Sequence, residues 1–358
     1  MKKVIFISAI ALAAAVSCTK SEVVDTKFNE QIGFETYLGR DAQTKAAVAT
    51  NDNLGNVAVY AYYTGNSPWS SSSPTNLWDG VIQINKNGAI VAPENAGDKY
   101  WANPDDLYSF FAYAPVDEAK VGTPNTLNPT INFTVQDDIP AQVDLLYADV
   151  TNIKNKKPAD FTGGKVQLNM KHALSRITVK AKAEDGDFKF DVKEITLAGN
   201  FNVTGNLPLS TGVWTDAKSA TNGSTFEIFN NTPEGKTEYA AYDPKNNTAL
   251  TTAYKDYAGD KNYLMIIPTE TEENATLRVY YTTYYANQES VVMYKDIQVP
   301  INFAMGKAYS INLIFSHKAE KITFSVTVDS WDETADVDTD DNAQSVTPDN
   351  STTVTPAA

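Results

Sequence analysis

The chain offers few residues that could do chemistry, and its single cysteine is the most conspicuous of them. Cys18 is the only cysteine in 358 residues, so it cannot form a disulfide within the chain. With only two histidines in the sequence, His172 and His317, it is also a poor metal ligand. Its place directly after a short apolar run indicates another use of the thiol, the attachment of a lipid.

The first seventeen residues have the layout of a secretory signal peptide. Two lysines precede an apolar run over residues 4–16, which is too short to cross a bilayer because a membrane-spanning helix needs about 20 apolar residues. The small residues Ala15 and Ser17 lie where a signal peptidase requires them. The pattern predicts cleavage before Cys18 and lipidation of its sulfur; the alternative is an ordinary signal peptide with an incidental cysteine.

Charge and length narrow the class of protein. Loss of the signal peptide removes two lysines, which lowers the formal charge from −15 to −17. A strongly acidic exported chain repels phosphate backbones, so nucleic acid is not an expected partner. The mature chain is long enough for two domains, and without disulfides these must be held together by burial of apolar residues. No second apolar span is found in the sequence, so we expect a protein that is anchored to a membrane through lipid rather than threaded through it.

The sequence carries no recognisable catalytic or metal-binding motif. His172 in KHALSRI and His317 in FSHKAEK stand at the ends of expected strands, outside any triad or ligand pattern. The run Asp336–Asp341 lacks the central glycine and the distant glutamate of an EF-hand loop, which favours a solvated acidic tail. The pair Asp137 and Asp138 is more typical of a turn than of an acid/base couple. We therefore expect no enzymatic activity, no cofactor and no metal.

Short strands, in which apolar and polar residues alternate, are the elements that the sequence predicts. Apolar side chains occupy every second position in 177–183, 309–315 and 322–328, which predicts strands with one buried face. The stretches 56–64 (NVAVYAYYT) and 107–115 (LYSFFAYAP) are apolar on both faces, as expected of central strands covered on both sides. The predicted fold class is all-β, a largely antiparallel β-sandwich.

Changes in composition divide the chain. The segment 152–165 combines a basic run, a proline and a Gly-Gly pair, which suggests a boundary, and the acidic stretch after Trp331 has too few large apolar residues to fold alone. The expected organisation is a lipoprotein signal peptide (1–17), a tether or pro-segment (18–30), an N-terminal β-sandwich domain (31–160), a C-terminal β-sandwich domain (161–332) and an acidic, threonine-rich disordered tail (333–358).

The strand LRVYYTTYY is rich in tyrosine on both faces. Tyr281 and Tyr285 point to one side, and Tyr280 and Tyr284 point to the other. One pair should belong to the core. The other pair, if exposed, could stack on sugar rings or bind a partner surface, and the alternative is that it packs against a loop.

Several phrases, taken in order, resemble the fimbrillin family, the Mfa-like and FimA-like pilus subunits that anaerobic gut and oral Gram-negative bacteria export as lipoproteins. The resemblance covers about residues 30–332. It rests on IGF at 32–34, GR…TKA at 39–46, VAVYAYY at 57–63, YWANPDDLYSFFAYAP at 100–115, QVDLLYA at 142–148, VQLNMKHALSRITVKA at 166–181, GKAYSINLIF at 306–315 and ITFSVTVDSW at 322–331.

This resemblance implies two tandem transthyretin-like antiparallel β-sandwich domains and assembly into a type V pilus. In that mechanism a trypsin-like protease removes the N-terminal segment, and a strand from a neighbouring subunit fills the vacated groove. The matching cleavage point is Arg40, with Lys45 as second choice; the alternative for Arg40 is an ordinary surface arginine. Ile32, Phe34 and Thr36 would form one face of the strand that is lost.

The implied partners are other fimbrial subunits joined by β-strand addition, the outer membrane through the lipid anchor, and a host protein or glycan receptor. The C-terminal stretch 345–358 departs from the stalk-subunit pattern, because Pro348 and Pro356 cannot donate ladder hydrogen bonds. A tip, accessory or anchoring role therefore stays open, and the alternative function is that of a monomeric surface lipoprotein that binds glycans.

Overall fold

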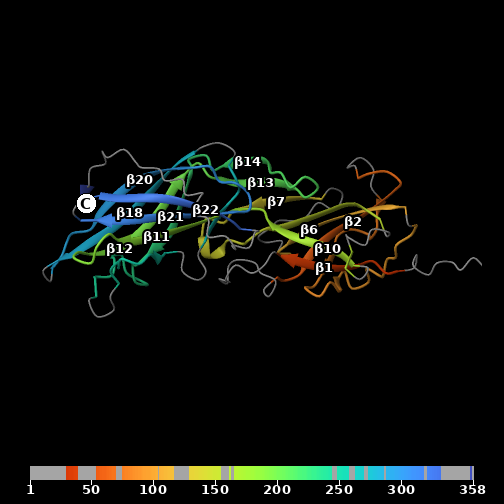
Figure 1. Ribbon diagram of the computed structural model, residues 1–358, viewed down its shortest axis with the longest axis horizontal. Coiled ribbons are helices and arrows are strands. Elements are labelled where there is room, and N and C mark those ends of the chain that lie inside the picture. Colours follow the sequence, from red (N-terminus) through yellow and green to blue (C-terminus); the bar gives the residue numbers. More distant parts are fainter. Residues whose placement is uncertain are drawn as a thin grey trace, which may run out of the picture.

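The fold consists almost entirely of β-strands, as the alternation of apolar residues predicted (Figure 1). The computed structural model describes residues 30–38, 54–69, 75–103, 105–116, 129–154, 161–162, 165–243, 248–257, 263–269, 273–285, 288–317, 321–331 and 355–356. Within these ranges the only helical element is the short 3-10 turn η2 (Ile139–Ala141).

The strands of the first half are β1 (Gly33–Leu38), β2 (Val57–Gly65), β3 (Thr75–Asn76), β4 (Ile82–Ile84), β5 (Ile90–Ala92), β6 (Leu107–Ala114), β7 (Thr130–Thr134), β8 (Leu146–Ile153), β9 (Phe161–Thr162) and β10 (Lys165–His172). Those that follow are β11 (Ser175–Ala183), β12 (Lys189–Gly199), β13 (Asn202–Pro208), β14 (Thr215–Ser219), β15 (Ser224–Asn230), β16 (Lys255–Asp256), β17 (Leu264–Ile266), β18 (Glu273–Tyr285), β19 (Gln288–Glu289), β20 (Met293–Ile301), β21 (Lys307–Ser316), β22 (Lys321–Ser330) and β23 (Thr355–Pro356).

The first sandwich is one sheet folded over its own core. Its strand order is β1-β10-β8-β6-β2-β4-β5, with β3 and β9 on side branches. Residues 165–170 of β10 pair with β1, and only Lys171 and His172 pair with β8, so β10 passes from one layer to the other. Phe34 of β1 meets Phe110 of β6 edge to face, with ring centroids 5.6 Å apart, which places the apolar core between the two layers.

The second sandwich consists of two separate sheets. One has the order β16-β11-β21-β22, with β17 beside β11, and the other has the order β15-β12-β18-β20-β23, with β19 beside β18. Phe315 of β21 lies between them, 5.4 Å from the ring of Phe190 on β12 and 5.3 Å from that of Tyr281 on β18. The pairings are antiparallel except β1 with β10 and β11 with β21, which are parallel.

The two sandwiches lie end to end along the long axis of the molecule and share strands at their junction (Figure 1). Strand β7, from the first half of the chain, pairs with β13 and so joins the β13–β14 hairpin of the second half. One apolar cluster runs from Tyr60 and Tyr113 in the first sandwich through Phe133 to the core of the second. The sandwiches are therefore packed against each other rather than joined by an open linker.

The alternation read from the sequence matches the burial. Every residue of β6 is buried, and β2 is buried through Tyr62, so both are covered on two faces as predicted. The domain limits 31–160 and 161–332 stay a prediction, although β9 and β10, C-terminal to the predicted boundary, pair within the first sheet. The chain leaves the first sheet for good only after His172, and continues through residues 173–174 into β11 of the second sandwich.

The core of the second sandwich gives a direct test of this packing. Phe315 is fully buried between two sheets, so Phe315→Ala should lower the free energy of unfolding by about 3–5 kcal/mol, through lost transfer energy and the cavity left behind. Urea denaturation followed by tryptophan fluorescence measures the change. Val291→Ala, at a side chain 71% exposed, is the control and should change it by about 0.5 kcal/mol or less. Equal effects of the two substitutions would contradict the arrangement.

Candidate functional site

Strand β1 forms one edge of the first sandwich and is held by two different partners. Residues 30–32 bond to the backbone of residues 99–101, with Ile32 N donating to Lys99 O at 2.8 Å and Trp101 N donating to Glu30 O at 3.0 Å. Residues 33–38 then pair in parallel with residues 165–170 of β10. Among the strands that the structure describes, none lies beyond β1, and β1 alone covers the outer hydrogen-bonding edge of β10.

The inward side chains of β1 and of Ile32, the residue before it, complete the core of the first sandwich. Ile32, Phe34 and Leu38 are 2%, 1% and 5% exposed, whereas Tyr37 on the same strand is 43% exposed. The ring of Phe34 lies 6.1 Å from that of Trp78, in addition to its contact with Phe110. Ile32 and Phe34 thus face inward, as the sequence predicted, and Thr36 is half-buried. Without β1 an apolar groove along β10 would be open.

A tight turn fits closely against the backbone of β1. Gly88 has a φ of +78°, and a Cβ built on it would lie 1.9 Å from the carbonyl oxygen of Phe34. The turn is closed by Asn85, whose carbonyl oxygen accepts from Gly88 N at 2.8 Å. Both the positive φ and the lack of space require glycine here, so the hairpin between β4 and β5 is shaped to contact β1.

The residues predicted to be modified, Cys18, Arg40 and Lys45, lie outside the described residues, as does the run 336–341. The structure places Leu38, the end of β1, two positions before Arg40. Among the described residues no helix is long and apolar enough to cross a membrane.

A second edge belongs to β20 in the second sandwich. Its inner side pairs with β18 along nine residues, from Met293 to Ile301. On its outer side it pairs with β23, where Thr355 lies opposite Tyr294 and Pro356 opposite Met293. These two residues fall in the tail 333–358, whose other residues lie outside the described ranges, so its disorder stays a prediction. The edge of β20 accepts an antiparallel strand.

The junction of the two sandwiches holds a buried polar cluster. The Nδ1 of His172, at the end of β10, lies 2.9 Å from Asp144 Oδ1, and both side chains are buried. The His172 ring stacks on Trp331, with centroids 4.0 Å apart and ring planes 6° from parallel. Arg176, at the start of β11, lies over the other residues of this cluster, 5.1 Å from the Trp331 ring and 4.7 Å from that of Tyr263.

Burial has an electrostatic cost in this cluster. Desolvation lowers the pKa of Arg176, while the Tyr263 hydroxyl and the carboxylates of Asp144, Asp329 and Asp256 act in the opposite direction. Backbone hydrogen bonds fix the same crossing, since Leu174 O accepts from Gly306 N at 3.0 Å, and Gly306 O accepts from Trp331 N at 2.8 Å. The phrases DLLYA, KHALSRI, GKAY and VDSW, far apart in the sequence, therefore meet at one place.

The other polar residues singled out from the sequence do not form a reactive site. His317 is exposed, and its ring stacks on Phe188 with centroids 3.3 Å apart. Asp137 and Asp138 are exposed in the bend before η2. Within the described ranges no group of three or more His, Cys, Asp or Glu side chains is placed to hold a metal ion.

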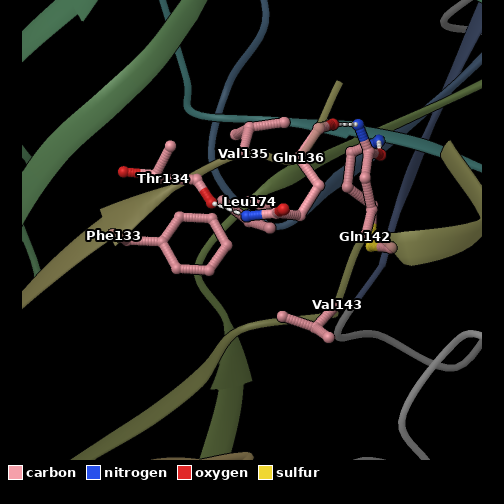
Figure 2. Close-up of a pocket in the computed structure, with 8 residues that line it drawn as sticks. Phe133, Thr134, Val135, Gln136, Gln142, Val143 and Leu174 are labelled. Atoms are coloured by element: carbon pink, nitrogen blue, oxygen red, sulfur yellow. Dashed lines mark hydrogen bonds between the residues drawn. The ribbon is translucent and has the colours of Figure 1, made fainter. Parts of the chain in front are cut away.

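A crevice between β7, η2 and the start of the second sandwich is closed by one amide side chain (Figure 2). Gln142 Nε2 donates to Gln136 O at 2.8 Å, and Gln142 Oε1 accepts from Met265 N at 2.7 Å. Phe133, Val143 and other apolar side chains line the rest. Since both ends of the Gln142 amide are bonded to the backbones of Gln136 and Met265, the crevice is a packed seam between the sandwiches and offers little to a ligand.

The tyrosines of β18 divide as the sequence predicted. Tyr281 is 7% exposed and belongs to the core. Tyr280 and Tyr284 face the other way and are half-buried, with Tyr239 6.2 Å from the Tyr280 ring and Tyr242 4.6 Å from the Tyr284 ring. The segment carrying Tyr239 and Tyr242 thus covers much of this face, which matches packing against a loop better than an open aromatic platform.

These features, an edge strand that completes a core and two β-sandwiches in tandem, agree with the comparison to known protein families, where the fimbrillin-like family matches residues 44–331. The chain belongs to the fimbrillin-like family. No curated protein matches it. Among solved structures, a fimbrial protein from Bacteroides vulgatus is similar to this fimbrillin-like chain with a TM-score of 0.60 and 20% identity, covering 85% of this chain and 100% of the other.

Two further solved structures are less similar to the fimbrillin-like chain. A candidate cell adhesion protein from Bacteroides uniformis has a TM-score of 0.48 at 15% identity, covering 84% of this chain and 98% of the other. The fimbrial anchor protein Mfa2 from Porphyromonas gingivalis has a TM-score of 0.36 at 14% identity, covering 84% and 97%. At these identities the likeness concerns the fold alone.

The sequence did not reveal the buried junction cluster of this fimbrillin-like chain. His172 was interpreted as an ordinary strand-end histidine, and nothing in the spacing of Asp144, His172 and Trp331 indicates that they meet. The available signal was that each stands in one of the phrases that carry the family resemblance. Sequence reasoning likewise did not single out Gly88 as a contact of β1.

The Gly88 turn provides a test of how β1 is held. Gly88→Ala should loosen β1, because the added Cβ collides with the backbone of Phe34, and amide hydrogen exchange at residues 33–38 should become at least tenfold faster. Gly97→Ala is the matched control, since Gly97 also has a positive φ, +66°, but its Cβ would meet nothing within 4 Å. Equal exchange in the two variants would show that the contact does not hold β1.

The two histidines form a matched pair for testing the junction. His172→Ala should lower the free energy of unfolding by about 3 kcal/mol, because it removes a buried hydrogen bond to Asp144 and the stacking on Trp331. His317→Ala removes a stacking contact at an exposed site and should have an effect of about 0.5 kcal/mol. Chemical denaturation measures both. A negligible effect at His172 would contradict a structural role for the cluster.

Proposed function

We propose that this chain is a fimbrial subunit or fimbrillin-like adhesin at the cell surface, which assembles by strand exchange after proteolytic removal of its N-terminal segment. The observation that carries the proposal is the arrangement of β1. It is an edge strand that inserts Phe34 and Leu38 into the core, together with Ile32 just before it, and it ends two residues before Arg40.

Strand replacement follows from the chemistry of that edge. Removal of β1 would expose the outer backbone groups of β10 together with pockets lined by Val166, Leu168 and Met170. An extended peptide with alternating apolar residues satisfies both needs at once. An empty groove would leave these apolar side chains in contact with water, so an incoming strand that covers them would be held strongly. The family match begins at residue 44, C-terminal to β1.

The remaining parts of the proposal concern export and anchoring. Cys18 carries the lipid of the precursor and ties it to the outer membrane, and cleavage at Arg40, or at Lys45 as second choice, separates the folded domains from that anchor. Membership of the fimbrillin-like family supports other fimbrial subunits as partners. The function is structural and does not involve a reaction on a substrate.

A tip, accessory or anchoring role is favoured over that of a repeating stalk subunit. Pro348 and Pro356 interrupt the C-terminal stretch and weaken it as a donor strand. The pairing of residues 355–356 with β20 is short, and it occurs at the second sandwich rather than at β10. The alternative of a monomeric glycan-binding lipoprotein has less support, because Tyr280 and Tyr284 are half-buried beneath neighbouring tyrosines.

Limited proteolysis tests the proposal. The full chain is incubated with trypsin, and the product is identified by N-terminal sequencing and by electrophoresis in SDS without heating. We expect a core that begins at Asp41, and this start should disappear in Arg40→Ala but persist in Lys45→Ala. Ladders of multimers would indicate a stalk subunit, and a trimmed monomer would indicate a tip or accessory component. A core that retains residues 30–40 covalently would contradict the processing step.

Release of the cleaved strand is tested separately. After cleavage β1 is held only by non-covalent contacts, so Phe34→Ser should speed the loss of the 30–40 peptide by at least tenfold, measured by native mass spectrometry. Tyr37→Ser on the same strand alters a side chain that is 43% exposed and serves as the control. Similar release rates in both variants would show that the inward face of β1 does not control the exchange.

A further inference from the structure

A lysine in the second sandwich is buried to an unusual degree. Lys193 is 1% exposed, and its neighbour Asp191 on the same strand, β12, is 2% exposed. Lys193 Nζ donates to Asp191 Oδ2 at 2.7 Å and to Ala240 O at 2.7 Å. Lysine and aspartate are almost never fully buried unless they are paired, so this pair occupies a position of high electrostatic cost.

The local backbone explains how the lysine comes to lie there. The register between β12 and β18 shifts between Val192 and Glu194, so Lys193 is the extra residue of a bulge. The segment after β15 then covers this part of β12, because Tyr239 OH donates to Glu194 Oε2 at 2.6 Å. Bulges redirect side chains, and here the redirected side chain is enclosed beneath the covering segment.

Asn231 is the third member of the site. Its backbone N donates to Lys193 O at 2.9 Å, and its own carbonyl oxygen accepts from Ala240 N at 3.3 Å. Since Lys193 Nζ also reaches Ala240 O, the three residues form a closed set of contacts. The side-chain Oδ1 of Asn231 is buried, and no described residue donates a hydrogen bond to it. Backbone hydrogen bonds thus hold Asn231 next to Lys193 and to Ala240, the residue that Lys193 Nζ contacts, and the side-chain carbonyl of Asn231 is desolvated.

We propose that Lys193 and Asn231 form an intramolecular isopeptide bond, in a self-catalysed reaction in which Asp191 carries the protons. The Lys193 amine is the nucleophile, the Asn231 side-chain amide is the electrophile, and Asp191 carries the protons. The reaction needs no substrate or cofactor from outside the chain. The reaction modifies the chain once and does not turn over.

The chemical balance is simple. A proton moves from the Lys193 ammonium to the Asp191 carboxylate along their 2.7 Å hydrogen bond, which leaves a neutral amine and a neutral acid. The amine then rotates from Ala240 O towards Asn231, and its lone pair attacks Cγ. Asp191 gives its proton to the amide nitrogen, and Nδ2 departs with it. The Cγ–Nζ bond forms and the Cγ–Nδ2 bond breaks, which releases ammonia. The Asp191 carboxylate accepts the surplus proton from Nζ and passes it to this ammonia, which leaves as ammonium, so Asp191 ends as a carboxylate.

The bond would tie β12 to the segment that follows β15. That segment is otherwise held by isolated contacts such as those of Ala240 and Tyr239, whereas the strands on the other side of β12 are held by a long ladder with β18. A covalent tie at this point would close a loop in the chain and restrict the unfolded state.

Peptide mapping of the unmodified wild-type chain decides the question. The full chain is denatured, digested and analysed by tandem mass spectrometry. We expect a branched species that joins the peptides containing Lys193 and Asn231, with a mass lower than their sum by one ammonia. Separate, unmodified peptides would overturn the proposal. So would loss of ammonia from the Asn231 peptide alone, which indicates a succinimide, or loss of water with a link between Lys193 and Asp191.

Variants assign the roles within the site. Lys193→Met, Asn231→Ala and Asp191→Asn should each abolish the branched peptide, the last because the amide cannot accept the amine's proton. Lys255→Met is the control: Lys255 is an exposed lysine of β16 whose charge is also felt by Asp191, although desolvation lowers its pKa, and the branched peptide should persist in this variant. A branched peptide in the Asp191 variant would show that Asp191 does not take part in the mechanism. If a variant does not fold, the peptide map of the wild-type chain still decides whether the bond forms.

Discussion

The hydrogen-bonding capacity of β10 is the constraint on which the two-sandwich arrangement depends. One edge of this strand is covered by β1 along residues 33–38, its last two residues pair with β8, and the chain then continues into β11 of the second sandwich. A strand in this position cannot remain unpaired, because its backbone groups and inward side chains would both be exposed to water. The N-terminal segment satisfies that requirement within one chain, which is why its loss would create a demand for another strand.

The junction that follows β10 is held by more kinds of contact than the edge of β10 that β1 covers. His172 ends β10 inside a cluster with Asp144, Trp331 and Arg176, and the backbone of residues 173–174 is bonded to segments from both halves. Strand β7 crosses over to pair with β13, which adds a ladder between the sandwiches. The structure therefore combines an edge strand with a junction that is bonded to both sandwiches. In the proposed exchange, this junction would preserve the groove while its occupant changes.

The second sandwich concentrates its buried charge away from that groove. Lys193 and Asp191 lie beneath the segment after β15, where a β-bulge has turned a strand residue into an enclosed one. The same segment packs Tyr239 and Tyr242 on the tyrosines of β18. A single covering segment thus explains both why the aromatic face is not open and why a lysine is desolvated. Packing between the two sheets of the second sandwich does not by itself cover the outer tyrosines of β18 or bury Lys193.

The sequence by itself determined the all-β class, the doubly covered strands 57–62 and 107–114, the inward faces at 177–183 and 309–315, and the inward Phe34, because period-two alternation and burial are local properties of a strand. Only the tertiary structure decided that β1 runs parallel to β10 and that β10 belongs to the first sheet. The same holds for the meeting of Asp144, His172 and Trp331, and for the position of Asn231 beside Lys193. Strand partners and contacts between distant segments follow from how the sheets close on one another, and a local pattern carries no record of that closure.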